Sequence, residues 1–519
     1  MVLTLLLLVP ALTGVALLAV ARSEHAERPS STQVVALVGS VVALGLTVVA
    51  AVARPEVDTR WMPSLGVRWH LAVDGISVPL LLLTAALTVV VVVHARGREP
   101  ARDLPGERSA ASFYACILLV ETGALATFLA RDAIVFFVAF EVVLVPMWVL
   151  IGRFGDEHVS EQTRADAAGR FVLFTVLGST LMLLGILIVT TTTGTSDLVA
   201  LAATRGAGLD HGTQVAAAVL LVVGLGIKIP LWPVHSWLPP AHTVAPTAGS
   251  VLLAAVLLKM GTYGIVRVVI PVVPDGFAAV APYLAVVGAV ATVWGGLACL
   301  VERDLKRLVA YSSVAHMGFV ALGLASGTWT GLQAALFGNI AHGVVSALLF
   351  LVVGGLKERW GSADLEVARA ALRDVSPRLG WSLVVGFAAT LGLPGLIGFW
   401  GELLALYAAW QPAGDRPVGA FRAAVVVSLV GLGLAAAYAL RVLRLVWVGG
   451  SGERGVTPLP AAGQPRDAGG REWAVVLLLV AATIAGGVLP RPLMAATSDD
   501  ARATVGEAGV SGATGCCGR

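Results

Sequence analysis

The sequence GLGIKIPLWPVHSWLPPAHTVAPTAGSVLLAAVLLKMGTYG, residues Gly224–Gly264, carries the features that decide the fold. It places Lys228 and Lys259 in apolar sequence that is typical of membrane-spanning helix. An ammonium group in hydrocarbon costs at least ~2.5–3.5 kcal/mol on insertion scales, so a lysine there indicates function unless it reaches the membrane surface. Pro230 and Pro233 follow Lys228 and interrupt helical hydrogen bonding. A helix broken beside a charge at membrane depth predicts an ion or proton site.

Lysine is scarce in this chain, which makes its positions informative. Among 35 basic residues only Lys228, Lys259, Lys306 and Lys357 are lysines, and all the others are arginines. Arginine keeps its proton in proteins, whereas a buried lysine can release it. The lysines at 228 and 259 therefore indicate groups that exchange protons. Lys306 in VERDLKRLVAYSS and Lys357 in LKERW are interpreted as solvated topology signals at helix ends.

The composition predicts an all-α integral membrane protein. The chain has 519 residues, of which 57% are hydrophobic and 13% charged. Apolar stretches long enough to cross a bilayer recur along its whole length. We expect fourteen transmembrane helices, approximately at 2–20, 34–52, 76–93, 112–130, 134–151, 170–192, 214–239, 245–270, 277–299, 305–326, 330–355, 380–405, 419–445 and 472–490. The net charge of +3 is attributed to the loops and indicates no nucleic-acid partner.

Cofactor motifs are missing from the sequence. Cys116, Cys299, Cys516 and Cys517 form no CxxC pattern and no metal-ligand spacing. No GxGxxG or P-loop context is present either. We therefore expect no cofactor and no metal in this chain. The tail from Ser498, ending in GATGCCGR, is predicted to be poorly ordered, and the role of its two cysteines stays open.

Charge and helix breaks indicate how the helices are arranged. Arginine and lysine concentrate in and beside the odd-numbered loops, so these loops are predicted to be cytoplasmic and both termini to lie outside. A second break is predicted at Pro394, between Gly392 and Gly395, in the twelfth span. Breaks five spans apart lie in oppositely directed helices, as in inverted repeats. Two inverted five-helix repeats are expected, formed by spans 4–8 and 9–13.

Two glutamates lie within the fourth and fifth predicted spans. Glu141, in IVFFVAFEVVLVPMWVLI, is expected to pair with Lys228, since pairing relieves the cost of both buried charges. Glu121, in CILLVETGALATFLA, is a weaker candidate, for which a neutral, hydrogen-bonded structural role is equally compatible with the sequence.

A further polar row runs through spans 10 to 12. His316 in AYSSVAHMGF and His342 in FGNIAHGVVS lie on neighbouring spans, and Glu402 follows the second break. A single buried histidine is often structural, but two neighbouring ones favour a relay that holds or passes protons near neutral pH. Glu402 would end this relay, the alternative being a carboxylate at the helix rim. His235 and His242, beyond span 7, fit either proton transfer to the cytoplasmic face or a structural role.

Three motifs resemble one known family. IKIPLWPVHSWLPPAHTVAPTAGSVLLAAVLLKMGTYG, DLKRLVAYSSVAHMGF and FEVVLVPMWVLIGRFG are similar to the antiporter-like membrane subunits of respiratory complex I, NADH:quinone oxidoreductase. The similarity covers roughly residues 70–450 and is greatest to the subunit M group, which has glutamate where most relatives have lysine at the position of Glu402. Pro240 and Lys357 depart from the family pattern.

The resemblance implies roles for matching residues. Those expected to form the proton relay are Glu141, Lys228, Lys259, His316, His342 and Glu402. The implied function is proton translocation coupled to redox chemistry in partner subunits, which would hold NADH, FMN, iron–sulfur clusters and quinone. The expected partners are other membrane subunits, especially the related L and N subunits, within a bacterial cell membrane.

The sequence leaves two alternative functions open, and it predicts a division of the chain into four parts. A subunit of a multisubunit Na⁺/H⁺ antiporter is the main alternative, and a membrane scaffold with vestigial polar residues is the second. The predicted divisions are 1–111 for the first three spans, 112–271 and 277–445 for the two repeats, and 446–519 for the last span and tail.

Overall fold

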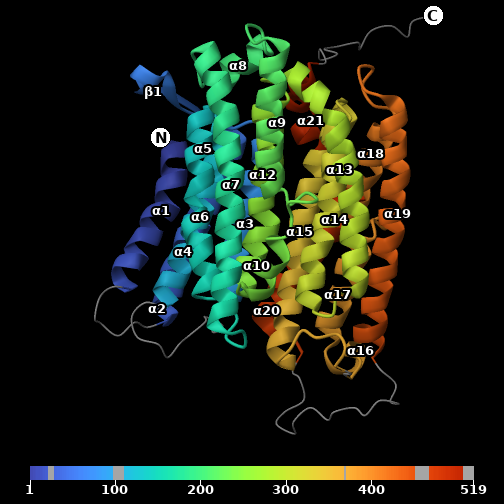
Figure 1. The fold of residues 1–519 in the computed structure, drawn as a ribbon. Helices are drawn as coiled ribbons and strands as arrows, with labels where there is room; N and C mark the ends of the chain where they lie inside the picture. Colours follow the sequence, from blue (N-terminus) through green and yellow to red (C-terminus); the bar gives the residue numbers. More distant parts are fainter. Residues whose placement is uncertain (22–28, 97–109, 368–369, 450–466, 507–519) are drawn as a thin grey trace, which may run out of the picture.

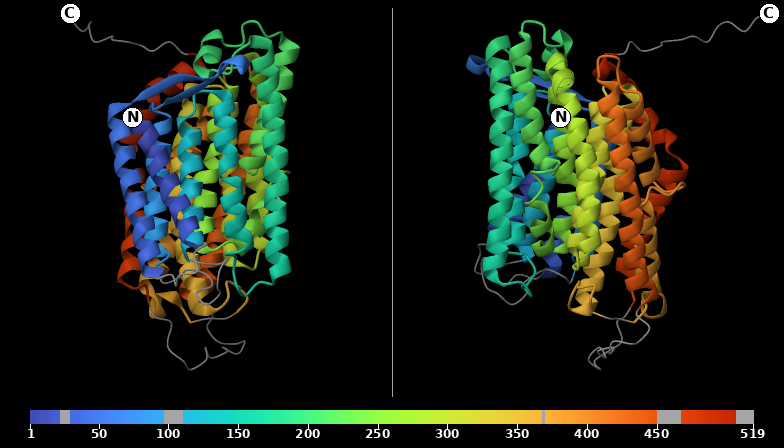
Figure 2. Two further views of the ribbon diagram at one scale, coloured as in Figure 1. Left: turned by 90° about the vertical axis from the view of Figure 1, so that its left-hand side faces the viewer. Right: turned by 45° about the vertical axis from the view of Figure 1, so that its right-hand side comes forward.

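Long, roughly parallel helices form an upright bundle (Figure 1, Figure 2). This computed structural model describes residues 1–21, 29–96, 110–367, 370–449 and 467–506. Within these residues, thirteen helices are long and apolar enough to cross a membrane. The chain is therefore a multi-pass, predominantly helical membrane protein, as its sequence predicts.

The first part of the chain forms the helices on the left of Figure 1. Several begin at a polar residue whose side chain accepts a hydrogen bond from the first turn, for example Asp132, Ser160 and Asp210. The elements are α1 (Val2–Ala21), α2 (Pro29–Ala53), α3 (Ser77–His94), α4 (Ala110–Leu129), α5 (Ala133–Val142), α6 (Leu144–Gly152), α7 (Glu161–Thr193), α8 (Leu198–Thr204), α9 (His211–Lys228), α10 (Leu238–Val244), α11 (Thr247–Leu252), η2 (Leu253–Leu257), α12 (Leu258–Gly264) and η3 (Ile265–Val269).

The second part packs beside the first. Its elements are α13 (Pro274–Val301), α14 (Leu305–Ala325), α15 (Trp329–Trp360), α16 (Leu372–Val375), α17 (Pro377–Thr390), α18 (Gly398–Trp410), α19 (Val418–Val442), η4 (Leu443–Val448), α20 (Gly470–Val488) and α21 (Arg491–Val505).

Both predicted helix breaks are present. The chain leaves helical geometry after Lys228 and resumes it in α10, and the carbonyl of Ile227 accepts a hydrogen bond from Trp237 Nε1 at 3.0 Å. The predicted twelfth span is two helices, α17 and α18, so neither half is among the thirteen candidate spans. The two broken helices run in opposite directions (Figure 1). Their relation by an inverted repeat stays a prediction.

The most buried helices lie at the centre of the bundle. In the most apolar 18-residue stretch of each helix, buried residues make up 94% in the run from Thr247 to Val269 and 89% in α15, against 33% in α2. Small residues bring neighbouring backbones together, as a Cβ added to Gly178 of α7 would lie 2.8 Å from the carbonyl oxygen of Gly224 in α9. The outer helices present apolar side chains outward, whereas the central ones carry the buried polar residues.

A two-stranded hairpin at the upper end is a feature that the all-α prediction missed. Its antiparallel strands, β1 (Glu56–Met62) and β2 (Val67–Ala72), are joined by η1 (Pro63–Leu65). His70 anchors it, with Nδ1 2.6 Å from Asp197 and Nε2 2.8 Å from Glu56. Polar residues alternating with apolar ones allow one face of this ribbon to pack on the bundle.

The predicted disorder from Ser498 onward is wrong as far as Val505. Residues 491–505 form α21, which packs on the upper end of the bundle. Asp500 accepts a hydrogen bond from the Gly75 amide at 2.6 Å, and the Arg502 guanidinium lies 4.7 Å from the Trp329 ring centre. These tertiary contacts order a segment whose composition alone is polar. Cys516 and Cys517 lie outside the described residues.

His70 makes the attachment of the hairpin dependent on pH. The hydrogen bond to Asp197 raises the pKa of His70, and Glu56 adds to this effect against the opposing effect of burial. A raised pKa means that the stabilisation is complete below the ordinary value of ~6.5 and is lost as pH rises through the raised pKa. His70→Gln should therefore lower the melting temperature at pH 6, and its difference from wild type should shrink towards pH 9. Thermal unfolding of the purified protein across this range measures it. The exposed His158→Gln is the control, and a pH-independent difference for His70→Gln would contradict the prediction.

Candidate functional site

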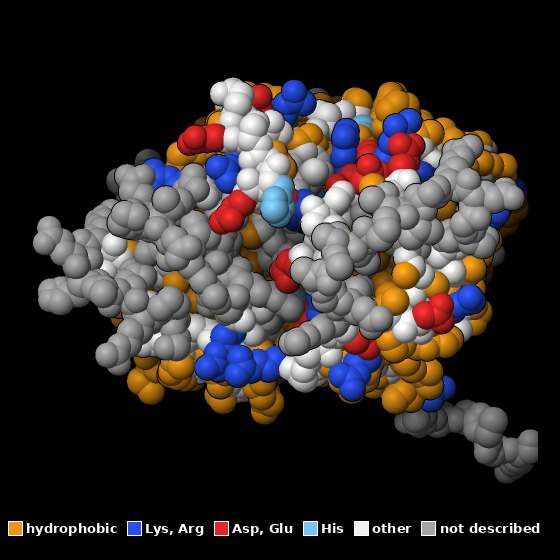
Figure 3. Space-filling view, turned by 90° about the horizontal axis from the view of Figure 1, so that it is seen from below, with side chains coloured by type: hydrophobic (Ala, Val, Ile, Leu, Met, Phe, Trp, Pro, Cys, Tyr) orange, Lys and Arg blue, Asp and Glu red, His pale blue; other side chains and the backbone are white. Residues whose placement is uncertain are grey.

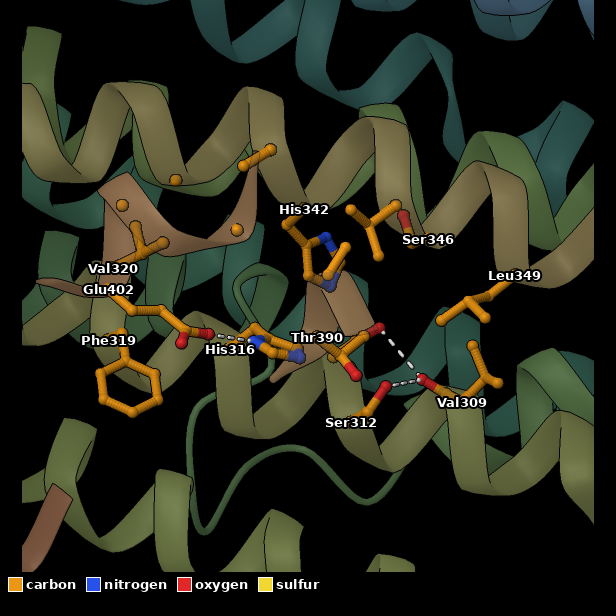
Figure 4. Close-up of a pocket in the computed structure, with 17 residues that line it drawn as sticks. Val309, Ser312, His316, Phe319, Val320, His342, Ser346, Leu349, Thr390 and Glu402 are labelled. Carbon is orange, nitrogen blue, oxygen red and sulfur yellow. Dashed lines mark hydrogen bonds and ion pairs between the residues drawn. The ribbon is translucent and has the colours of Figure 1, made fainter. Parts of the chain in front are cut away.

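Four of the predicted residues form one connected line through the interior. Lys259 Nζ lies 2.6 Å from His342 Nδ1. The rings of His342 and His316 have centres 6.0 Å apart. His316 Nδ1 lies 2.8 Å from Glu402 Oε1 (Figure 4). The line therefore joins α12, α15, α14 and α18, which come from both parts of the chain.

Lys259 is completely buried at the centre of the bundle. It lies in α12 between the two π-helical turns η2 and η3, and π-helical turns often mark functional sites. Its ammonium donates a hydrogen bond to the carbonyl oxygen of Ala254, at 2.8 Å, in addition to its contact with His342. One backbone dipole and one imidazole are thus the immediate polar partners of this lysine.

His316 and Glu402 each have an unused hydrogen-bonding atom. His316 Nε2 and Glu402 Oε2 are buried and have no hydrogen-bond partner among the described residues. An imidazole can accept a proton on one nitrogen and release one from the other. The unused atoms leave the line able to change its protonation pattern without breaking an existing contact.

A cavity lined by a few polar side chains among apolar ones lies along this line (Figure 4). It offers about 40 Å³ of space for the centres of water molecules and is lined by parts of α14, α15, α17 and α18. The hydroxyl groups of Ser312, Ser346 and Thr390 lie on one side of the two histidines, and Glu402 lies on the other. A water needs ~10–15 Å³ of such space and two to four polar partners, so the cavity has room for a few waters beside the histidine pair.

The second helix break makes room for Glu402. Gly392 has φ +61° and Gly395 has φ +90°, a backbone region that favours glycine. A Cβ on Gly392 would lie 2.7 Å from Glu402 Oε2, which is closer than side chains tolerate. The glycine therefore allows both the turn of the chain and the approach of the carboxylate.

Lys228 and Glu141 are near each other electrostatically but not in contact. Lys228 ends α9, and its Nζ lies 4.9 Å from the ring centre of Phe140 and 5.8 Å from that of Phe171. Neither Lys228 Nζ nor Glu141 Oε1 has a hydrogen-bond partner among the described residues. Glu141 is nevertheless the carboxylate whose charge acts on Lys228. The predicted direct pair is thus a longer-range interaction in this structure.

Other candidate groups have distinct surroundings. Both carboxyl oxygens of the fully buried Glu121 lack a partner among the described residues, so the hydrogen-bonded structural role considered for it is not observed. The described residues contain no group of three or more His, Cys, Asp or Glu side chains suited to a metal ion. His235 Nε2 accepts a hydrogen bond from Trp294 at 3.0 Å, which favours a structural role for this histidine. His242 is fully buried.

The expectation that Lys306 and Lys357 are solvated is wrong. Lys306 is 3% exposed, and its ammonium donates a hydrogen bond to the carbonyl oxygen of Ala245. Lys357 forms an ion pair with Asp156 in the α6–α7 connection. The charged sequence around both lysines suggested a surface, but the folded chain brings the α10–α11 connection and the α6–α7 connection over them.

The cavity hydroxyls were missed in the sequence, although a signal for two of them exists. Ser312 precedes His316 by four residues, and Ser346 follows His342 by four. Residues four apart lie on the same face of a helix, so each serine shares the face of its histidine. Thr390 comes from α17, and nothing in its local sequence indicates that it lies near them.

Comparison with known proteins shows which family the chain resembles. Residues 130–435 match the family described as NADH:quinone oxidoreductase/Mrp antiporter, transmembrane. NADH-quinone oxidoreductase subunit M of Rickettsia bellii is 31% identical over 441 residues, which is 83% of this chain and 85% of the relative. Subunit M of Rhodobacter capsulatus is 34% identical over 443 residues, covering 83% and 81%.

Solved structures share the fold. A chain of respiratory complex I from Thermus thermophilus, solved with bound NADH, superposes with a TM-score of 0.80 at 28% identity, covering 98% of this chain and 100% of that one. A chain of the Mrp complex from a Dietzia species gives a TM-score of 0.81 at 23% identity, covering 97% and 98%. At that identity the second likeness concerns the fold alone.

Proposed function

Because the chain belongs to the transmembrane family of NADH:quinone oxidoreductase and Mrp antiporter subunits and aligns over most of its length with relatives named subunit M, we propose that it is the M subunit of a proton-translocating NADH:quinone oxidoreductase. The single observation that carries the proton-translocating part is the line from Lys259 through His342 and His316 to Glu402. Its members all exchange protons, and they are joined by short contacts across the middle of the bundle.

The proposed chemistry is proton movement without formation of covalent bonds between heavy atoms. Lys259 gives a proton to His342, the histidine pair passes it on, and Glu402 releases it. Glu402 is a suitable final group because a carboxyl group has an unperturbed pKa of ~4.3, against ~10.4 for lysine. Because these groups interact closely, they are expected to titrate as a set.

Glu141 and Lys228 supply the coupling in this proposal. Two unit charges ~6 Å apart interact by about 3 kcal/mol at an effective dielectric of ~20. Movement of Glu141 would therefore change how firmly Lys228 holds its charge, and the charge on Lys228 would in turn act on Lys259. Glu121 lies outside this line and has no role in the proposal.

The proposed orientation in the membrane rests on the charges of the loops, and the proposed partners rest on the family. The lower face of Figure 1 carries described odd-numbered loops such as the α6–α7 and α13–α14 connections, and it is the proposed cytoplasmic side of a bacterial membrane, with both termini outside. Glu402 then lies in the outer half of the membrane. The L and N subunits are the proposed neighbours, and NADH, FMN, iron–sulfur clusters and quinone belong to partner subunits. The divisions 1–111, 112–271, 277–445 and 446–519 are the proposed units of the chain.

A cation/H⁺ antiporter subunit is the second candidate, since the matched family and the shared fold include Mrp antiporters. Inverted membrane vesicles separate the two functions. Acidification of the vesicle interior driven by NADH in sodium-free buffer supports the oxidoreductase. Acidification that requires a Na⁺ gradient and ignores NADH supports the antiporter.

Lys259 must be able to lose its proton. Lys259→Arg keeps the charge but not the proton exchange. We expect NADH-driven pumping by the assembled complex to fall ~10²-fold, as for loss of a positioned proton-transfer group. Native gels check that the complex assembles. Pumping at the wild-type rate would mean that the position needs only a positive charge.

Glu402 should be the releasing group of the line. Glu402→Gln retains the size and a hydrogen bond to His316 but removes the exchangeable proton, so pumping should slow by about tenfold. Glu402→Lys restores an ionisable group and should retain more activity than the Gln variant. Equal pumping by wild type and Glu402→Gln would place proton release elsewhere.

Glu141 should control pumping through charge. Glu141→Ala removes the carboxylate that acts on Lys228, and we expect a several-fold loss of pumping in assembled complex. Glu141→Asp, which keeps the charge, should retain most of it. The pairing is wrong if the Ala and Asp variants pump equally well.

A further inference from the structure

The helical run that carries Lys259 continues to a charged group at the upper end of the bundle. Tyr263 and Arg267 follow Lys259 at intervals of four residues, a spacing that places them on one side of a helix. The Arg267 guanidinium lies 5.4 Å from the centre of the Tyr263 ring, and the Tyr263 hydroxyl donates a hydrogen bond to the Phe128 carbonyl oxygen at 2.8 Å. At ~1.5 Å per residue, Arg267 lies ~12 Å above Lys259 along the helix axis.

Arg267 forms an upper trio with Asp74 and Arg131. Asp74 lies in the connection between β2 and α3, and Arg131 lies in the connection between α4 and α5. Asp74 Oδ2 pairs with Arg131 Nη2 at 2.6 Å and also with Arg267 Nη2. The Arg131 amide donates to the His70 carbonyl oxygen at 2.9 Å, which places the trio against the hairpin at the upper end (Figure 1). The trio therefore joins three separate elements above Lys259.

Near neutral pH no member of the upper trio exchanges protons. Arginine keeps its proton in proteins. Asp74 uses both carboxyl oxygens, because Oδ1 accepts hydrogen bonds from the amides of Ile76 and Ser77 at 3.1 and 2.9 Å and Oδ2 is shared by the two guanidinium groups. Burial would raise the pKa of Asp74, but the charges of Arg267 and Arg131 outweigh it and hold the pKa well below the ordinary value of a carboxyl group. Two guanidinium groups and one carboxylate thus leave one fixed positive charge.

The trio is incompletely bonded for a purely structural clamp. The Nε atoms of Arg131 and Arg267 are buried and have no hydrogen-bond partner among the described residues. An unmade hydrogen bond of a buried charged group destabilises a protein, and apolar contacts of similar volume often hold elements together better than a buried ion pair. Asp500 of α21 binds the neighbouring Gly75 amide at 2.6 Å, so this carboxylate is bonded to backbone. The second arginine is therefore better explained by its charge than by its bonds.

The lower end of the molecule differs from the upper trio. Acidic and basic side chains lie side by side on the lower face, together with a histidine (Figure 3). Carboxylates and imidazoles can exchange protons with water, whereas guanidinium groups cannot. Groups able to exchange protons are therefore present at the lower end, whereas the trio above Lys259 offers none.

Resting on the function proposed above, we propose that Arg131, Asp74 and Arg267 form a fixed-charge barrier that closes the outer end of the bundle above Lys259 to protons and small cations. A fixed positive charge repels hydronium and sodium ions, as arginine does in aquaporin-type pores. Without the barrier, a proton from the outer side would reload Lys259 and return to the cytoplasm, so that pumped protons would be lost. With it, the contact with His342 is the way by which the proton of Lys259 leaves.

The first test measures passive proton flux, without any pumping. Proteoliposomes with the purified, assembled complex receive an imposed pH gradient, while valinomycin and K⁺ hold the membrane potential at zero. Flux through protein-free liposomes is subtracted. Arg267→Gln removes the fixed positive charge and leaves Asp74 paired with Arg131, so flux should rise about tenfold over wild type. Arg131→Gln should act in the same way.

A matched control tests whether any arginine on the outer side has this effect. Arg68→Gln removes an arginine from the hairpin, where the side chain is 37% exposed and pairs with Asp58. Its flux should equal that of wild type. The proposal is overturned if Arg267→Gln is as tight as wild type, or if Arg68→Gln leaks as much as Arg267→Gln.

A second comparison separates charge from packing. Asp74→Asn breaks the ion pairs with both arginines but makes the trio more positive, so the barrier predicts flux no higher than in wild type. A purely structural clamp predicts a leak at least as large as that of Arg267→Gln, and that result contradicts the proposal. If Asp74→Asn does not assemble, Arg267→Lys decides the question, because it keeps the charge and loses the planar pairing with Asp74. A leak in Arg267→Lys equal to that in Arg267→Gln would also overturn the barrier.

The last variants connect the barrier to Lys259 and separate it from the proposed function. Arginine at position 259 does not exchange protons, so the double variant Arg267→Gln/Lys259→Arg should be as tight as wild type. A persistent leak would bypass Lys259 and overturn the proposal. If Lys259→Arg alone loses NADH-driven pumping while Arg267→Gln stays tight, the barrier is wrong and the proposed function stands. If Lys259→Arg pumps normally, the proposed function itself is wrong.

Discussion

The hydrocarbon interior of the membrane penalises every polar group that has no partner, and this constraint shapes the structure around Lys259. The ammonium of Lys259 donates a hydrogen bond to a backbone carbonyl and contacts an imidazole nitrogen. A π-helical turn precedes and another follows the helix α12 that carries this lysine. Further along the line, Glu402 Oε1 contacts His316, and Oε2 lies in space that a side chain at position 392 would crowd. The irregular helices are therefore the places where the bundle accommodates charge. The regular outer helices shield them from lipid.

Most of the architecture could be predicted from the sequence, because the length and hydropathy of apolar stretches identify membrane helices. The positions of the two helix breaks could also be predicted, since proline and glycine act locally on the backbone. Lys259, His342, His316 and Glu402 were predicted as members of one relay, from the cost of burying ionisable groups and from the family resemblance. That they lie in mutual contact required the tertiary structure, because they come from four helices distant in sequence.

Local sequence was misleading where distant segments cover a charged stretch. Lys306 lies among charged neighbours that are typical of a surface, yet the chain around Ala245 buries it. The segment after Ser498 looks disordered by composition, but Asp500 binds the Gly75 amide across more than four hundred residues. The hairpin anchored by His70 was missed for the same reason, since its carboxylate partner Asp197 follows another helix. In each case a long-range contact outweighed the local pattern.

The surroundings of Lys228 differ from those of Lys259 in a way that divides their tasks. Its ammonium faces the rings of Phe140 and Phe171, and aromatic faces attract a cation by ~0.5–2 kcal/mol without offering a lone pair that could accept its proton. Lys259, in contrast, touches an imidazole nitrogen. In the proposed relay, Lys228 would therefore act on its neighbours through its charge alone, since its aromatic surroundings offer no acceptor for its proton. Lys259 would be the first group from which a proton can leave, because its ammonium contacts a ring nitrogen.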